Sequence, residues 1–283
     1  MKHIISIQSS VAYGYVGNRT AVFALETIGI PVIQINTVQF STHTGYSGYA
    51  GEIFSASHIN SLLTSLENSG LTGKSQALLS GYIGNRETGE TILEHVKRLK
   101  ASNPNFIYCC DPVMGDTPHG LYVKQEIADF FLHNALFEAD ILIPNHFEAC
   151  YLSGIAIESE KSARRAVESL HAKGCKIVLI TSYKTASDKT IGFFLSTGNK
   201  CAILETPRLY FANTPKGTGD LVSSLFLGNY LLNNDIEYSL ELTANAVYEI
   251  LLLTQSQHDT ELSLVQGRDM LINPTIQFAV RTL

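Results

Sequence analysis

A glycine-rich turn in the last third of the chain carries the residues best suited to chemistry. Gly217, Thr218 and Gly219 precede Asp220, and the apolar spacing of residues 220–232 predicts a helix that begins at this turn. Glycine lets the backbone come close to a ligand, and the free N–H groups at a helix N-terminus attract anions such as phosphate. An aspartate beside that anion can accept a proton from a substrate hydroxyl. The pattern indicates phosphoryl transfer, with a purely structural helix cap as the alternative.

The turn differs from the two common nucleotide-binding signatures. It lacks the spacing of a Walker A motif, and it does not follow the first predicted strand, where a dinucleotide-binding fingerprint would lie. The residues that do follow that strand are SSVAYGYVG rather than a G-x-G-x-x-G turn. This difference disfavours a nicotinamide-dependent oxidoreductase.

Three acidic residues near the middle of the chain are candidates for holding a metal ion. Asp111 and Asp116 flank a short Pro-Val-Met-Gly segment, and Glu148 follows Asn145 by three residues. Mg²⁺ prefers carboxylate oxygens and keeps waters and phosphates as its other ligands, so these acids can hold it directly or through water. The alternative is structural: Asp111 caps a turn, and Glu148 completes a capping box with Asn145.

Small polar residues after two early strands are candidates for recognising a substrate. Ser9 and Thr44, together with Asp220, are suited to bind a polar heteroaromatic ring. A lone Ser or Thr after a strand more commonly makes a turn hydrogen bond, which is the alternative for each. The loop of residues 41–48 (STHTGYSG) either packs Tyr46 near a flat ligand or is an ordinary loop.

Short β-branched runs alternate with longer helical patterns along the whole chain. This alternation predicts a mostly parallel sheet with helices on both faces, an α/β fold with a single domain over residues 1–283. The expected strands are 3–8, 29–36, 76–80, 105–110, 140–143, 175–181, 190–195 and 201–205, and the expected helices are 19–28, 57–68, 87–100, 158–173, 220–232 and 238–254. Ligands bind beyond the carboxyl ends of such strands, and polar or glycine-rich residues follow many of these runs.

Composition narrows the choice of partners and compartment. The net charge is −6 with no run of Lys or Arg, which argues against a nucleic-acid or anionic-membrane surface. Five cysteines are present without zinc-site spacing, and adjacent Cys109 and Cys110 lie in an apolar run that predicts buried thiols. The N-terminal apolar stretch is too short for a signal peptide, and no segment has the length of a membrane helix. We expect a soluble, cytoplasmic protein that binds small molecules.

Seven ordered blocks of sequence resemble pyridoxal kinases of the ribokinase superfamily. They are SIQSSVAYGYVGNR (6–19), NTVQFSTHTGYSGY (36–49), LLSGYIG (78–84), YCCDPVMGD (108–116), ILIPNHFEACYLSG (141–154), VLITS (178–182) and KGTGDLVSSLFLG (216–228). The match runs along nearly the whole chain, and the N-terminal blocks are similar to the pyridoxal branch rather than to sugar kinases.

The resemblance implies a fold and an activity. The fold is a Rossmann-like three-layer sandwich of the ribokinase type. The reaction transfers phosphate from ATP to the 5′-hydroxyl of pyridoxal, and possible further substrates are pyridoxine and pyridoxamine. The family uses Mg²⁺, is often helped by a monovalent cation (K⁺ or Na⁺), and is usually a homodimer.

The same resemblance implies roles for individual residues. Asp220 is the implied base, and Gly217, Thr218 and Gly219 are the implied anion hole and also ATP contacts. The implied substrate contacts are Ser9, Thr44, Tyr82 and Asp220. The implied nucleotide contacts are Asp111, Asn145, Glu148, Thr181 and Ser182, and the implied metal site is Asp111, Asp116 and Glu148. Residues 116–122 resemble a flap that closes over ATP, and Lys216 either adds positive charge near the phosphates or is a solvated lysine.

Two further functions remain open from the sequence. One is a kinase for another hydroxymethyl heterocycle, such as the thiamine-precursor pyrimidine. Such enzymes commonly carry a cysteine where Asp220 stands here, which ranks them lower. The other is a weakly catalytic protein that chiefly binds pyridoxal, which the complete Gly-Thr-Gly-Asp turn argues against.

Overall fold

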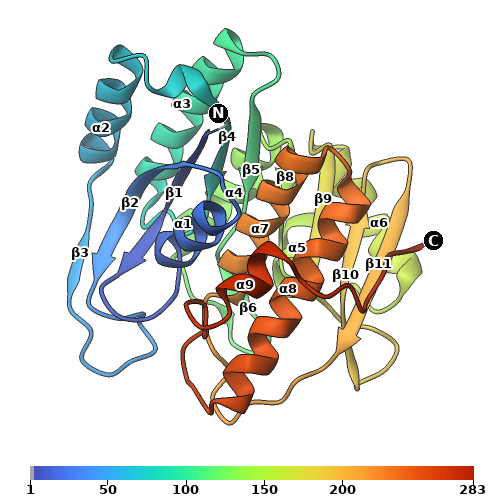
Figure 1. Cartoon of the computed structure of the whole chain (residues 1–283). Helices are drawn as coiled ribbons and strands as arrows, with labels where there is room; N and C mark the ends of the chain where they lie inside the picture. Colours follow the sequence, from blue (N-terminus) through green and yellow to red (C-terminus); the bar gives the residue numbers. More distant parts are fainter. Residues whose placement is uncertain (1–2) are drawn as a thin grey trace.

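A ten-stranded sheet forms the centre of the molecule. The computed structural model describes residues 3–283, and Figure 1 shows the sheet between two groups of helices. In spatial order the strands are β12 (Arg281–Thr282), β11 (Cys201–Pro207), β10 (Thr190–Ser196), β9 (Ile177–Tyr183), β8 (Ile141–Leu142), β5 (Ile107–Cys110), β4 (Ser75–Ser80), β1 (His3–Val11), β2 (Val32–Phe40) and β3 (Gly51–Ile53). A separate two-stranded ribbon pairs β6 (Gly115–Asp116) with β7 (Gly120–Leu121).

The six central strands run parallel, and the edges run antiparallel. The strands β9, β8, β5, β4, β1 and β2 pair in parallel, whereas β10, β11 and β12 at one edge and β3 at the other pair antiparallel. The antiparallel β10–β11 hairpin turns at Gly198, whose φ of +85° suits glycine. Because parallel strands end at one edge, the polar residues that follow them gather there.

Two hydrophobic cores lie on the two faces of the sheet, because neighbouring residues of a strand point to opposite sides. Cys110 packs with one core and Cys109 with the other. The first core contains α2 (Ala56–Asn68), α3 (Arg86–Ser102), α4 (Gln125–His133), α5 (His146–Ser153) and α6 (Glu160–His171). The second contains α1 (Asn18–Thr27), α7 (Thr218–Asn233), α8 (Ile236–Ser256) and α9 (Arg268–Ile272).

The predicted α/β layers agree with this structure, with shifts at several element ends. The second strand begins at Val32 rather than at residue 29, because Gly29 and Ile30 close the C-terminal turn of α1 through backbone bonds. The last of the predicted helices, α8, begins earlier than predicted, at Ile236, where the Asp235 side chain accepts the Tyr238 N–H. The prediction omitted the short elements α4, α5, α9, β3, β6, β7 and β12.

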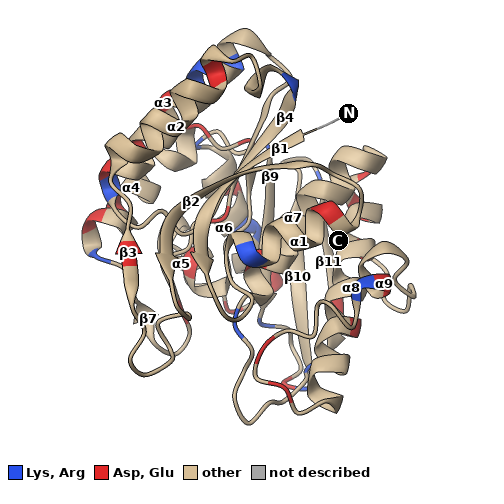
Figure 2. Cartoon of the chain, turned by 60° about the vertical axis from the view of Figure 1, so that its left-hand side comes forward, with Lys and Arg blue, Asp and Glu red and all other residues tan. Residues whose placement is uncertain are grey.

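Charged residues in the described part of the chain do not gather on one face of the molecule. Acidic and basic residues are interspersed over the helices and loops in Figure 2. Among residues 3–283, no helix is both long and apolar enough to cross a membrane. Cys109, Cys110, Cys175 and Cys201 are buried free thiols, as predicted for the adjacent pair.

Candidate active site

The N-terminus of α7 forms one wall of the candidate site, and glycine is required there. Gly217 is the N-cap and has φ of +84°, in the left-handed region. A Cβ at this position would lie 1.8 Å from the carbonyl oxygen of Tyr15, so the turn packs directly against the segment after β1. The predicted helix therefore starts at Thr218, with Gly219 and Asp220 in its first turn and backbone N–H groups free for an anion.

Asp220 lies where α7 meets the start of α1. Its Oδ2 accepts the backbone N–H of Gly17 at 2.8 Å. A Cβ at Gly17 would come within 2.4 Å of the Ser9 hydroxyl oxygen, so Ser9 adjoins the same corner. Burial raises the pKa of Asp220 to about 6, and the Gly17 N–H opposes that rise. The carboxylate therefore titrates close to neutrality, as suits a proton acceptor.

A second group of acids faces Asp220 from the middle strands. Asp111 follows β5 and is 6% exposed, and its pKa lies well above the usual range because of burial and then repulsion from Glu148 and Asp220. Burial also raises the pKa of Glu148 to about 8, although three backbone N–H groups favour its ionised form. A cation bound between buried carboxylates that repel one another stabilises their ionised forms.

Glu148 makes the predicted capping box and also bonds to the base of the β6–β7 ribbon. Its Oε2 accepts the Asn145 N–H at 2.8 Å, and the Glu148 N–H donates to Asn145 Oδ1 at 3.0 Å. Its Oε1 accepts the Met114 N–H at 3.0 Å, and Asn145 Nδ2 donates to the Gly115 carbonyl at 2.7 Å. The structural alternative for Glu148 is thus correct, and the same contacts tie the base of the β6–β7 ribbon to α5.

The three acids predicted to hold Mg²⁺ do not form a closed protein site. Within residues 3–283, no three His, Cys, Asp or Glu side chains are grouped closely enough to hold a metal alone. Asp116 Oδ1 is nevertheless buried without a hydrogen-bond partner in the described chain, and Asp116 raises the pKa of Glu148 by repulsion. This donor set fits a Mg²⁺ that takes one or two carboxylates and completes its shell with waters and phosphates.

The predicted nucleotide contacts Asn145, Thr181 and Ser182 lie beside one another. Asn145 and Thr181 form an isolated parallel bridge, and the Thr181 N–H donates to the Pro144 carbonyl at 2.8 Å. Thr181 is buried, whereas Ser182 is exposed and has φ of +51°, which is unusual for a residue with a side chain. The bridge extends the parallel pairing of β8 and β9 to the edge where the other polar residues gather.

The predicted substrate contacts lie at the same edge, on the β1–β2 side. Thr44 is exposed in the loop after β2, and Tyr82 is partly buried after β4. Thr37 Oγ1 donates to the Tyr82 carbonyl at 2.6 Å, which joins β2 to the segment after β4. Burial raises the pKa of the Tyr82 hydroxyl, and Tyr49 adds to the rise.

Gly17, His43 and Glu261 belong to this corner but were missing from the sequence prediction. Burial lowers the pKa of His43, Glu261 opposes that change, and Lys216 adds to it. Lys216 itself is exposed to solvent. Gly17 could have been predicted from the sequence, because it is a glycine directly before a predicted helix. No residue near Glu261 in the sequence marks it as part of the site.

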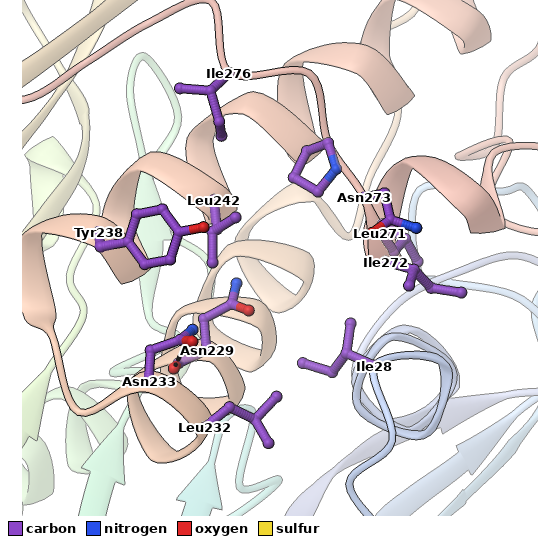
Figure 3. A pocket seen from close by; sticks show the side chains of 11 residues that line it. Ile28, Asn229, Leu232, Asn233, Tyr238, Leu242, Leu271, Ile272, Asn273 and Ile276 are labelled. Carbon is purple, nitrogen blue, oxygen red and sulfur yellow. Dashed lines mark hydrogen bonds between the residues drawn. The ribbon is translucent and has the colours of Figure 1, made fainter.

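The larger described cavity lies away from these residues. It has a volume of about 380 Å³ and lies between the C-terminal end of α7, the start of α8 and the segment after α9 (Figure 3). Asn229 and Asn233 line it, at the end of α7 opposite to Gly217. A smaller cavity of about 200 Å³ adjoins the candidate site, where Tyr15 and Glu261 line it.

Known proteins of similar sequence cover the whole chain. A family model described as phosphomethylpyrimidine kinase matches residues 71–261. Pyridoxal kinase PdxY of Pseudomonas entomophila is 39% identical over 283 residues, covering 99% of this chain and 98% of the relative. Pyridoxal kinase PdxY of Rubrobacter xylanophilus is 39% identical over 282 residues, covering 99% and 97%.

Solved structures of similar fold include two pyridoxal kinases. The Leishmania donovani enzyme in complex with ADP and pyridoxamine has a TM-score of 0.92 at 27% identity, and the match covers 100% of both chains. The Entamoeba histolytica enzyme has a TM-score of 0.91 at 26% identity, also with 100% of both chains covered. The likeness confirms the predicted ribokinase-like fold, and with the full-length sequence matches it establishes that this chain belongs to the pyridoxal kinase family.

Proposed function

We propose that this protein transfers the γ-phosphoryl group of ATP to the 5′-hydroxyl of pyridoxal, giving pyridoxal 5′-phosphate and ADP in vitamin B6 salvage. The observation that carries the proposal is the Asp220 carboxylate. It lies in the first turn of α7 and accepts a hydrogen bond from the Gly17 N–H at 2.8 Å. Its pKa is raised to about 6. A proton acceptor beside a helix N-terminus is the arrangement that alcohol phosphorylation needs.

In the proposed reaction Asp220 takes the proton of the substrate hydroxyl as that oxygen bonds to the γ-phosphorus. The bond from this phosphorus to the β–γ bridging oxygen breaks, and ADP leaves with the bond's electrons. The N–H groups at Gly217, Thr218 and Gly219 stabilise charge on the transferred group. Ser9, Thr44 and Tyr82 bind the pyridine ring, and Ser9 adjoins Gly17 at the same corner as Asp220.

The ATP side of the site is proposed to include Asp111, Asn145, Glu148, Thr181 and Ser182. Mg²⁺ would be held by Asp111, Asp116 and Glu148, directly or through water, and it would neutralise charge on the phosphates. The raised pKa values of Asp111 and Glu148 support this assignment, because a bound cation favours their ionised forms. A monovalent cation is a further proposed activator.

The flap, the domain and the assembly complete the proposal. The flap of residues 116–122, which contains most of the β6–β7 ribbon, would close over ATP and exclude water. Residues 1–283 would act as one domain, as a homodimer in the cytoplasm. The single ten-stranded sheet supports the one-domain assignment, because its strands come from both ends of the chain.

A hydroxymethylpyrimidine is the second candidate substrate, because the matching family model is described as phosphomethylpyrimidine kinase. The test is ADP release from Mg-ATP with pyridoxal, pyridoxine, pyridoxamine and the pyrimidine alcohol, each compared by kcat/KM. Pyridoxal is expected to give the highest value. A higher value for the pyrimidine alcohol would reverse the assignment, and saturable pyridoxal binding without ADP release would indicate a binding protein.

A further inference from the structure

Glu261 is a buried carboxylate that joins three distant segments of the chain at the candidate site. It is 5% exposed and lies in the segment between α8 and α9. Its Oε2 accepts the backbone N–H of Tyr15 at 2.9 Å, and its Oε1 accepts the Tyr46 hydroxyl at 2.8 Å. The imidazole Nε2 of His43 lies 3.8 Å from the same Oε1. Both carboxylate oxygens therefore have donors from outside the residue's own segment.

The contact of Glu261 with Tyr46 reaches the loop that carries Thr44. Backbone bonds close this loop at its base, where Ser41 pairs with Ala50. Farther along, Tyr46 makes polar contacts with Glu261 and Thr260, and His43 lies beside the same carboxylate. Because Thr44 lies two residues before Tyr46, the hydrogen bond from Tyr46 to Glu261 limits where Thr44 can lie.

The contact of Glu261 with Tyr15 reaches the Gly217 turn. The N–H of Tyr15 is fixed by Glu261, and the carbonyl of Tyr15 packs against the Cα of Gly217, where a Cβ would lie 1.8 Å away. Gly14, just before Tyr15, has φ of +94° and leaves room for the carboxylate, since a Cβ there would lie 2.5 Å from Glu261 Oε2. The same carboxylate thus sets the segment against which the anion-binding turn rests.

We infer that Glu261 is a positioning residue for the alcohol substrate. It fixes the position of the Thr44 loop and of the Tyr15 segment relative to the Gly217 turn. This role rests on the proposed kinase function and adds to it a residue outside all seven family blocks. Glu261 touches neither the reacting hydroxyl nor the phosphates in this assignment. It acts through Tyr46 and Tyr15, on the side of the site that binds the alcohol rather than ATP.

The chemistry of the two donors predicts which substitution preserves this role. The Tyr15 N–H can only donate, so it requires an acceptor oxygen. The Tyr46 hydroxyl can donate or accept. In Glu261→Gln the amide oxygen faces Tyr15 and the amide NH₂ donates to the rotated Tyr46 hydroxyl, so both contacts survive. In Glu261→Ala both are lost, and a buried N–H is left without its acceptor.

The experiment compares Glu261→Ala and Glu261→Gln, with Asp259→Ala as the matched control. Asp259 is an exposed acid two residues away, and its side chain accepts only the neighbouring Thr260 N–H among residues 3–283. Three quantities are measured: the KM of pyridoxal, the KM of ATP, and the Kd of pyridoxal without ATP by absorbance titration. Melting temperatures show whether each variant is folded.

For Glu261→Ala we expect the KM and Kd of pyridoxal to rise about tenfold or more, from the loss of two bonds to a charged group. The KM of ATP is expected to rise less than the KM of pyridoxal, because Glu261 reaches the Gly217 turn only through Tyr15 but bonds directly to Tyr46 of the Thr44 loop. Glu261→Gln should restore pyridoxal affinity to within about threefold of wild type, since both hydrogen bonds can re-form. The Asp259→Ala control should match wild type.

Tyr46→Phe keeps the inference testable if Glu261→Ala does not fold, because it removes one hydroxyl and leaves the Tyr15 contact intact. It should weaken pyridoxal binding several-fold with an unchanged KM of ATP. Wild-type pyridoxal affinity in folded Glu261→Ala, or an equal rise in both KM values, would overturn the role of Glu261. Absence of ADP release by the wild type with pyridoxal would instead refute the proposed function.

Discussion

Replacement of Asp220 by asparagine should abolish the proposed proton transfer and stabilise the fold above neutral pH. Asparagine has nearly the same shape, and its amide oxygen can still accept the Gly17 N–H that Asp220 now accepts at 2.8 Å. The amide has no basic group at this pH. Loss of general base catalysis typically lowers kcat about 10²–10⁴-fold, or ~3–5 kcal/mol of activation free energy. The KM of ATP should change little.

The stability effect follows from the pKa of Asp220, which rises from the ordinary aspartate value of 3.8 to about 6 in the folded protein. A raised carboxyl pKa means that the folded state prefers the protonated form, so its stability contribution is present at low pH and is lost as pH rises through about 6. A difference of about two units corresponds to at most ~3 kcal/mol, and partial exposure of Asp220 reduces this to an expected ~1–2 kcal/mol.

The assay is urea unfolding of both proteins at pH 8 and at pH 4, together with kcat at pH 8. Asp220→Asn should be more stable than the wild type at pH 8, and the gain should fade by pH 4, where the wild-type carboxyl is protonated in the folded state. The wild-type kcat/KM should also rise with pH through about 6. Retention of wild-type kcat would refute the base role. A loss of stability at pH 8 would refute the claim that burial destabilises the ionised carboxylate.

Three other substitutions probe separate parts of the site. Gly217→Ala should lower the melting temperature and kcat together, because φ of +84° disfavours alanine and its Cβ would meet the Tyr15 carbonyl. A wild-type melting temperature in this variant would contradict the close packing of Gly217 against Tyr15. Glu148→Ala should lower the free energy of unfolding, measured in urea, by ~3 kcal/mol or more, since three backbone N–H groups lose their acceptor. A loss under about 1 kcal/mol would show that water replaces the carboxylate as their acceptor. Ser9→Ala should raise the KM of pyridoxal more than that of ATP, and an unchanged KM of pyridoxal would remove Ser9 from the substrate site.

The sequence predicted the central sheet well because its strands are buried on both sides. In the predicted strand 105–110 every residue after Asn105 is apolar or aromatic, and β5 lies there with Cys109 and Cys110 in opposite cores. The short elements were missed for a physical reason. The β6–β7 pair has two residues in each strand, and its position depends on backbone bonds to Glu148, which no local periodicity encodes.

Site residues were predicted where they follow a strand or open a helix. Asp220 and Asn145 both lie in such places, and local sequence marks them. Glu261 has no such mark, because its role comes from partners at Tyr15 and Tyr46 that only the folded chain brings close. The sequence likewise allowed Glu148 to be a metal ligand or a capping residue as alternatives. The structure shows the capping box with Asn145 and two further N–H donors from Met114 and Gly115, and the metal role stays a prediction.

The hydrogen bonds that close the site join residues very far apart along the chain. Gly17 and Asp220 are separated by 203 residues, and Tyr15 and Glu261 by 246. Contacts of such long sequence separation form late in folding, because a large loop must close before they stabilise anything. During synthesis the strands β1 to β5 can pair while the ribosome is still adding α7 and the Glu261 segment. Enzymatic activity should consequently be the last property to appear as the nascent chain matures, well after most of its secondary structure.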